Sequence, residues 1–127
     1  TQDALDTLYR QAALIALATR YEGYGIVFAE AMGHGLPIVT TRAGAVPETV
    51  PPGAGLLVPS DDAGAVGAAL RRMLTDAQLR GTCAAAARRA AARLPGWPET
   101  ANVVAAALFG ATEGEAPAAL VSDHRRR

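Results

Sequence analysis

The sequence predicts an α/β fold in which helices flank a parallel sheet. Short apolar runs bounded by glycine or proline alternate along the chain with segments whose apolar residues have helical spacing. Such alternation is typical of layered folds in which a helix follows each strand. The runs that suit a strand are few, whereas a parallel sheet is normally covered on both faces and carries more strands. We therefore expect a part of a layered α/β domain.

The first half of the chain supplies two of the expected strands. Residues 3–13 have the spacing of a short helix, and residues 14–18 form an apolar run that suits a short buried strand. Residues 25–33 suit a helix that is apolar almost all round, so we expect it to pack on several sides. Gly35 is expected to end this helix, and residues 36–40 then form the second strand.

The middle of the chain supplies the third strand. Residues 42–53 are rich in glycine and proline, which predicts a loop with one helical turn near residues 47–50. Residues 55–58 form the strand. Residues 60–62, Ser-Asp-Asp, then cap a helix, because short polar side chains and negative charge favour a helix N-terminus. The apolar stripe of that helix is expected to comprise Val66, Ala69, Leu70, Met73 and Leu74.

Two further helices are expected. Thr75 and Gln78 match a capping box, which predicts a helix that runs to about residue 93. Its buried face is expected to comprise Leu79, Cys83, Ala86, Ala90 and Leu94. Pro95 and Gly96 break this helix, and Pro98 at a first helical position begins the last one, over residues 98–109.

The element order indicates one folded domain with a tail. Residues 1–110 look like the C-terminal part of a Rossmann-like domain whose first strands are missing. Residues 111–127 are polar and without period, so we expect them to be disordered, with the terminal arginines as solvated charge.

Composition excludes several classes of function. The 12 basic and 12 acidic residues balance, so no overall charge favours nucleic acid or an anionic membrane. Cys83 stands alone and suits a small buried apolar side chain rather than a reactive thiol. No apolar run is long enough to span a bilayer, and a cytoplasmic protein, in solution or at the inner face of the membrane, is expected. We find no cluster of metal-ligating residues, no Walker-type phosphate loop and no Ser/His/Asp set.

The most informative residue is Glu30. The stretch from Gly23 to Thr41 reads GYGIVFAEAMGHGLPIVTT, and Glu30 is its one formally charged residue. An ionised carboxylate in apolar surroundings is costly unless a partner pairs with it. The stretch itself offers no cation. A ligand with vicinal hydroxyls, such as a ribose, would satisfy Glu30, because a carboxylate accepts two hydrogen bonds at once.

The loop after the first expected strand has the composition of a phosphate site. Ligands of parallel sheets bind at the carboxyl ends of the strands, where loops lead into helix N-termini. Glu22, Gly23, Tyr24 and Gly25 occupy this place, and the two glycines would let a backbone approach a ligand closely. We expect free N–H groups from Gly23 to Ile26 to bind a phosphate.

Together these features give an order of ribose, pyrophosphate and sugar, with Glu22 facing the last of these. Each feature also has an ordinary explanation. Two glycines around one residue more often make a turn, and two glutamates eight apart occur by chance. His34 suits a helix end or the core, and Trp97 suits a packing anchor of the last helix.

The combined pattern over residues 19–59 resembles the signature region of family 4 retaining glycosyltransferases of the GT-B fold. The segments that carry the resemblance are Glu22-Gly23-Tyr24-Gly25, Glu30-Ala31, Gly35-Leu36-Pro37, the loop from Gly44 to Glu48, and the run from Gly55 to Pro59. The likeness extends over roughly residues 5–108. It implies that residues 1–110 are part of a GT-B C-terminal, nucleotide-sugar-binding domain.

The resemblance also implies roles for individual residues. Glu30 matches the acid that grips the nucleotide ribose, and Glu22 matches the acid near the donor sugar and the reacting centre. The amides of Gly23, Tyr24, Gly25 and Ile26 would contact phosphate or sugar. Such enzymes need no metal and no cofactor, and they transfer a hexose from a UDP- or GDP-linked donor to an acceptor with retention of configuration. The acceptor is not readable from this sequence.

Three departures from the family pattern stand out. Ala18-Thr19 replaces a common Pro-Ser, and Ala45 replaces a second glycine, which would hinder a backbone position of positive φ. No residue of the chain matches the Arg/Lys pair that neutralises the pyrophosphate in the family, and we expect this pair and the N-terminal domain that the resemblance implies to lie outside the given sequence.

These departures leave more than one reading of the chain. We expect a donor-binding fragment that is inactive alone. A non-catalytic module whose sheet edge is covered by a partner chain, and a fragment with no activity of its own, are the alternatives.

Overall fold

The computed structural model describes residues 1–109 of the chain, so the tail expected over 111–127 lies outside the described residues. The chain divides into two compact units, Thr1–Arg93 and a second that begins at Leu94. In the first unit, helices and strands alternate as expected. The elements are α1 (Gln2–Gln11), β1 (Ile15–Leu17), α2 (Ile26–Gly33), β2 (Ile38–Thr41), α3 (Val46–Thr49), β3 (Gly55–Val58), α4 (Ala63–Thr75) and α5 (Ala77–Ala91). The second unit contributes α6 (Trp97–Phe109).

The three strands form one parallel sheet in the order β1-β2-β3. Ile38 of β2 lies opposite Ile15 of β1 and Gly55 of β3. The central strand β2 is buried along its whole length. The expectation that β1 is buried is wrong, because β1 is an edge strand in the described sheet, and Ala16 and Leu17 are exposed.

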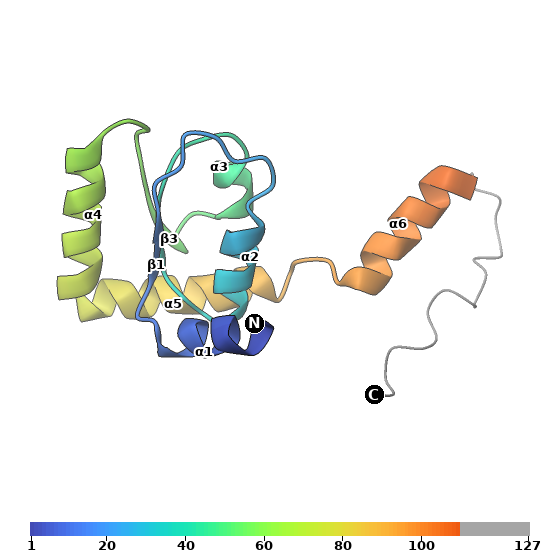
Figure 1. Cartoon of the computed structure of the whole chain (residues 1–127), viewed down its shortest axis with the longest axis horizontal. Coiled ribbons are helices and arrows are strands. Elements are labelled where there is room, and N and C mark those ends of the chain that lie inside the picture. The colour runs from blue at the N-terminus through green and yellow to red at the C-terminus, as the bar shows by residue number, and fades with distance from the viewer. Residues whose placement is uncertain (110–127) are drawn as a thin grey trace. The chain divides into compact units, whose positions relative to one another are not determined.

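Helices cover both faces of this sheet. In Figure 1, α4 lies on one side of the strands and α2 with α3 on the other, while α1 and α5 lie together at the lower end. The α2 face is packed by Phe28 and Met32 of α2, Ile38 of β2 and Val46 and Val50 near α3. The α4 face is packed by Val39, Ala69, Met73 and Cys83.

Helix α5 belongs to both layers. Its Ala87 joins the cluster on the α2 face, and its Cys83 joins the cluster on the α4 face. Cys83 is buried, and burial raises the pKa of its thiol, while the charge of Arg72 acts in the opposite direction. Cys83 is thus the small buried apolar residue that its alanine-rich surroundings indicate.

The boundaries of the helices test the capping predictions. Asp62 caps α4, and its Oδ1 accepts from the Ala65 N–H at 2.8 Å, as expected. The capping box from Thr75 is wrong by one residue: Asp76 is the N-cap of α5 and accepts from the Leu79 N–H at 2.8 Å. The Thr75 hydroxyl instead donates to the Arg71 carbonyl at 2.8 Å, because Thr75 is still the last residue of α4.

Two expected core leucines lie outside the core. Leu74 is 57% exposed and Leu94 is 43% exposed. Leu74 is the penultimate residue of α4, whereas Leu94 is not in a helix, because α5 ends at Ala91. No helix in the described part of the chain has both the length and the apolar character that crossing a bilayer requires.

Candidate functional site

Two loops meet at the carboxyl edge of the sheet, and the side chains of two threonines, one buried and one half-buried, fix them. The loop after β1 is fixed by Thr41 of β2, whose hydroxyl accepts from the Thr19 N–H at 3.0 Å and donates to the Thr19 carbonyl. Farther along this loop, the Thr49 hydroxyl of α3 donates to the Tyr24 carbonyl at 2.8 Å. The loop from Thr19 to Gly25 is therefore anchored at both ends.

Glu22 is the residue through which the two loops are joined. Its carbonyl oxygen accepts from the Ala45 N–H at 2.9 Å. A Cβ at Gly44 would lie 3.0 Å from the Glu22 nitrogen and impossibly close to the Glu22 carbonyl oxygen. Gly44 also has a φ of +52°, which L-residues rarely adopt. Gly44 is therefore required twice, for its conformation and for the space that it leaves.

The Glu22 carboxylate turns back to its own loop. It is half-buried, and its Oε1 accepts from the Gly25 N–H at 3.0 Å. The expectation that every amide from Gly23 to Ile26 is free is therefore wrong at Gly25. The carboxylate is held by this bond at the entrance of α2, where the positive end of the helix favours negative charge.

The N-terminus of α2 has no side-chain cap. Gly25 is the N-cap residue with a φ of +77°, and no side chain accepts from the first amides of the helix. The N–H groups of Ile26 and Val27 have no acceptor within the helix, because the first amides of an α-helix have no preceding turn to bond. Gly23, Tyr24 and Ile26 are exposed beside this terminus. The backbone that the sequence assigned to a phosphate is thus at the surface, with Gly25 as the exception.

Ala45 does not disturb the second loop. Its φ is −80°, and Gly44 alone takes the positive φ in this turn. The concern that Ala45 would strain a glycine position is therefore wrong. Ala45 instead begins α3 as its N-cap residue, a position with ordinary backbone angles.

Glu30 is exposed, and the expectation of a buried carboxylate is wrong. Helix α2 buries Phe28, Ala31 and Met32, and Glu30 stands between these positions on the opposite side of the helix. The apolar residues near Glu30 in the sequence thus pack in the core, and they do not enclose its carboxylate.

Glu30 nevertheless has a partner that its own stretch does not contain. The Tyr9 hydroxyl of α1 donates to Glu30 Oε2 at 3.2 Å. Tyr9 is 9% exposed, and burial together with the bond to Glu30 and its negative charge raises the pKa of the phenol. The Tyr9 ring also stacks on His34 with centroids 4.9 Å apart. Tyr9 thus fixes one oxygen of Glu30 and leaves the carboxylate accessible to solvent.

His34 is a helix-end residue, as the ordinary explanation held. It is the C-cap of α2, half-buried, and its Nε2 lies 3.2 Å from Asp6 Oδ1 of α1. Asp6 also pairs with Arg10 at 2.6 Å. This cluster joins α1 to the end of α2 away from the loops.

Sequence reasoning missed the residues that hold the site in place. Thr41, Thr49 and Tyr9 each bond a loop or a carboxylate that the sequence singled out. The pair of threonines that ends the apolar β2 run was a usable signal for Thr41. Tyr9 had no comparable signal, because its partner is 21 residues away and on another helix.

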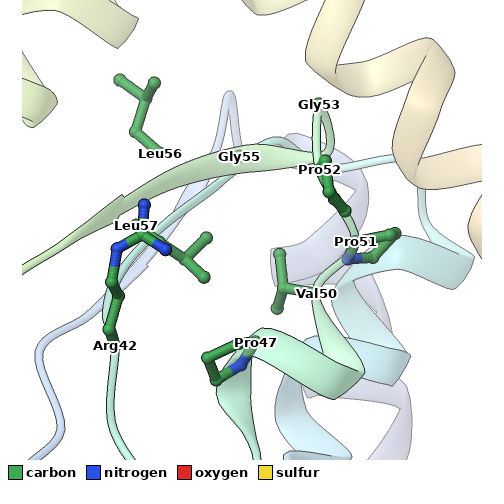
Figure 2. A pocket seen from close by; sticks show the side chains of 9 residues that line it. All are labelled: Arg42, Pro47, Val50, Pro51, Pro52, Gly53, Gly55, Leu56 and Leu57. Atoms are coloured by element: carbon green, nitrogen blue, oxygen red, sulfur yellow. The ribbon is translucent and has the colours of Figure 1, made fainter.

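Neither of two cavities on the first unit is lined by the six residues of the predicted site. Figure 2 shows one of about 380 Å³ between β3 and the segment that carries α3, where Arg42 is the one charged residue among mainly apolar neighbours. The other, of about 360 Å³, lies among α1, α5 and the turn after α2. Of the predicted residues, Glu22 is half-buried and Gly25 is buried, and the other four are exposed: Gly23, Tyr24, Ile26 and Glu30. Among the described residues, no group of three His, Cys, Asp or Glu could hold a metal ion.

The chain is similar to known proteins in sequence and in fold. The sequence model of the family described as glycosyl transferases group 1 matches residues 1–76. A D-inositol 3-phosphate glycosyltransferase of Salinispora arenicola is 37% identical over 106 residues, which are 80% of this chain and 23% of that protein. A GDP-mannose-dependent monoacylated alpha-(1-6)-phosphatidylinositol monomannoside mannosyltransferase of Corynebacterium glutamicum is 35% identical over 94 residues, 68% of this chain and 24% of that protein.

Solved structures agree with these relatives. Sucrose-phosphate synthase from Thermosynechococcus elongatus superimposes with a TM-score of 0.76 at 31% identity, over 87% of this chain and 29% of that one. The C-terminal domain of a glycosyl transferase group 1 family protein from Francisella tularensis gives a TM-score of 0.65 at 25% identity, over 72% of this chain and 48% of that one.

The chain spans about a quarter of the length of the curated relatives named above. Its parallel sheet and flanking helices are part of the GT-B fold that these glycosyltransferases share, as the sequence predicted. The signature residues, the matching family model and the solved relatives lead to one conclusion: the chain belongs to the glycosyl transferases group 1 family.

Proposed function

We propose that this chain is the donor-binding part of a nucleotide-sugar-dependent, retaining glycosyltransferase that transfers a hexose to an acceptor still to be identified. The observation that carries the proposal is the locked entrance of α2, where Glu22 bonds the Gly25 amide and Gly44 leaves room for Glu22. Membership of the family and the GDP-mannose dependence in the name of one relative support it.

In this proposal, Glu30 binds the ribose of the nucleotide. Its carboxylate is exposed, so a diol can reach it without a cavity having to open. The bond from Tyr9 orients Oε2 and reduces the number of side-chain conformations that must be lost on binding. Pre-orientation of this kind strengthens binding, because less entropy is lost when the ligand arrives.

The phosphates then lie at the N-terminus of α2. The Gly25 amide is already bonded to Glu22, so the exposed backbone of Gly23, Tyr24 and Ile26 is left to contact phosphate or sugar. The helix terminus favours an anion by roughly 0.3–1 kcal/mol where it is exposed to solvent. Such a contribution is small, which agrees with a site that needs further cations from outside this chain.

Glu22 has a different role from Glu30. Its Oε1 is held by Gly25, and in this proposal Oε2 accepts from a donor-sugar hydroxyl beside the reacting carbon. Glu22→Gln should therefore reduce turnover of the intact enzyme more than nucleotide affinity. Loss of nucleotide affinity with unchanged turnover would contradict this division.

The test is calorimetric titration of the chain with UDP and GDP, repeated on Glu30→Gln. The variant should bind the preferred nucleotide about 1–3 kcal/mol less tightly, because charge-assisted hydrogen bonds to the ribose are lost. Glu99→Gln is the matched control, since it removes an exposed carboxylate on α6, outside the signature region. An unchanged dissociation constant in Glu30→Gln removes Glu30 from the ribose role.

Activity assays address the rest of the proposal. The chain alone should transfer no sugar, since none of its residues matches the Arg/Lys pair that the resemblance assigns to the pyrophosphate, and measurable transfer by it would refute this part. Transfer by the intact enzyme is expected to proceed in excess EDTA, because the proposed mechanism uses no metal. A cytoplasmic location, in solution or at the inner face of the membrane, belongs to the same proposal and is checked by fractionation of the native host.

A second candidate, an interaction module, is favoured by one observation. Strand β1 is at the edge of the described sheet, and its Ala16 and Leu17 are exposed. Such an edge is a template for pairing with another strand. This candidate predicts a dimer in analytical ultracentrifugation, with the β1 amides protected from hydrogen exchange and Glu30 occluded. A monomer whose β1 amides exchange freely would reject self-pairing.

A further inference from the structure

The cavity at the amino-terminal edge of the sheet has no role in the proposed donor site. It holds about 360 Å³, and Pro37 and Ala13, which line it, come just before the strands β2 and β1. The loops of the proposed donor site follow these strands, at the carboxyl edge. The residues that line the cavity are Tyr9, Arg10, Ala12, Ala13, His34, Gly35, Leu36, Pro37, Ala77, Arg80, Gly81, Ala84 and Arg88.

The charged residues of this lining are all basic. Arg10 comes from α1, Arg80 and Arg88 come from α5, and His34 ends α2, whereas no carboxylate lines the cavity. Asp6 lies beside it and pairs with Arg10 at 2.6 Å and with His34 at 3.2 Å. Asp6 thus offsets the charge of Arg10, and Glu30 lies close by through its bond from Tyr9. Arg80 and Arg88 of α5 form no ion pair with any described residue, so they supply the positive charge of this cavity.

One of these arginines is held by hydrogen bonds, and another lies against a glycine. Nη1 of Arg80 donates to the Met73 carbonyl at 3.0 Å and to the Leu74 carbonyl at 2.9 Å, which fastens it to the end of α4. Arg88 lies across Gly35, where a Cβ would be 2.5 Å from the Arg88 Nε. Gly35 thus makes room for the Arg88 guanidinium, beyond its role at the positive φ of +71° that ends α2.

The floor of the cavity is made of small residues. Ala77, Gly81 and Ala84 lie on the face of α5 that also presents Arg80 and Arg88. A Cβ at Gly81 would have no atom within 4 Å, so the space above this helix is open. Small residues between two arginines leave room for a ligand that the guanidinium groups can reach from either end.

We propose that this cavity binds a dianionic phosphate group carried by a small molecule, at a site separate from the proposed donor site. Arginine presents several donors in a planar fork that matches phosphate oxygens. Several arginines together favour a doubly charged phosphate over a singly charged carboxylate as the bound anion. The volume exceeds that of a phosphate group alone, so the ligand carries a substituent that rests on the small residues of α5. Arg88 is the principal contact.

The test is a titration of the 127-residue chain with inorganic phosphate, followed by NMR of the Gly81 amide and the Arg88 Nε–H. Sodium chloride at the same ionic strength is the control for screening. Arg88→Gln should weaken phosphate binding by at least about ten-fold, because a charge-assisted contact is lost. Arg89→Gln is the matched control: it removes the same charge from the next residue, which is exposed and does not line the cavity.

A second variant tests the space rather than the charge. Gly81→Met fills the floor of the cavity without changing the net charge and should abolish the response to phosphate. Where this variant does not fold, the Arg88 and Arg89 pair still decides the question. Vesicles of phosphatidic acid in phosphatidylcholine form a second arm, because a lipid headgroup presents the same phosphate chemistry.

The outcomes separate the alternatives. Saturable phosphate binding that Arg88→Gln loses and Arg89→Gln keeps supports the site for a soluble ligand. Vesicle binding with the same dependence on Arg88, but no response to free phosphate, assigns the site to a lipid headgroup. Equal losses in the two variants, the same shifts with chloride, or no response in either arm would overturn the proposal. UDP or GDP binding at the opposite edge is measured separately, so failure of one site leaves the other unaffected.

Discussion

Gly44→Ala is the sharpest test of how the donor-site loops are held. An alanine at φ +52° has roughly 1–2 kcal/mol of conformational penalty that glycine does not. Its Cβ would collide with the Glu22 carbonyl oxygen, and that contact opens only if the two loops move apart. The movement would break the bond from the Ala45 N–H to Glu22, which contributes about 0.5–1.5 kcal/mol. The sum is a loss of roughly 1.5–3.5 kcal/mol in the free energy of unfolding.

Urea denaturation followed by circular dichroism measures this loss. Gly67→Ala is the control, because Gly67 lies within α4, is exposed and has no atom within 4 Å of an added Cβ. That substitution should stabilise the chain by about 0.5–1 kcal/mol through better helix propensity. In Gly44→Ala the Gly25 amide should also lose its bond to Glu22 and exchange faster. A Gly44→Ala variant within about 0.5 kcal/mol of the wild type, the range of a neutral surface change, would refute the reasoning.

Three further perturbations test other parts of the structure. Thr41→Val should reduce the free energy of unfolding in urea by about 1–3 kcal/mol, because the Thr19 N–H and carbonyl lose their buried partner; no change would mean that water replaces the hydroxyl. Asp76→Ala should cost about 1 kcal/mol of the same free energy, and Thr75→Ala distinctly less, because Asp76 caps α5; the reverse order would restore the capping box. Wild-type stability should fall as the pH rises above 10.0, the ordinary pKa of tyrosine, because the raised pKa of Tyr9 keeps the folded phenol protonated longer than the unfolded one. In Tyr9→Phe the free energy of unfolding, measured by urea titration between pH 9 and about 11, should fall less than in the wild type. An equal fall would show that Tyr9 is not the cause.

Most of the fold was predictable because local signals and packing agree. The third strand has the predicted bounds, and the helical turn predicted near 47–50 is present as α3. Glycine and proline mark these boundaries directly, since their backbone preferences are local. The exposure of β1 was not predictable, because a short apolar run can form either a central or an edge strand. Thr75 and Asp76 are both good caps, and only the length of α4 decides between them.

The site was predictable in its residues and less so in its contacts. The sequence placed Glu22 and Gly25 in one loop, but the bond between them follows from a turn that composition does not specify. The prediction of a buried Glu30 rests on the apolar composition of its stretch, whereas helical spacing turns Glu30 away from Phe28 and Met32. Contacts between distant segments, such as that of Tyr9 with Glu30, arise only when the helices pack.

Helix α5 has a consequence for the order in which this unit is completed during synthesis. The apolar clusters on the two faces of the sheet each contain one of its residues, Cys83 or Ala87. Both clusters therefore remain open to water until this late segment has left the ribosome, even though all three strands precede it in the chain. Exposed apolar faces on an early sheet invite association with other chains. We expect a nascent chain that stops before α5 to depend on chaperones, and a chain that includes it to close both layers in one step.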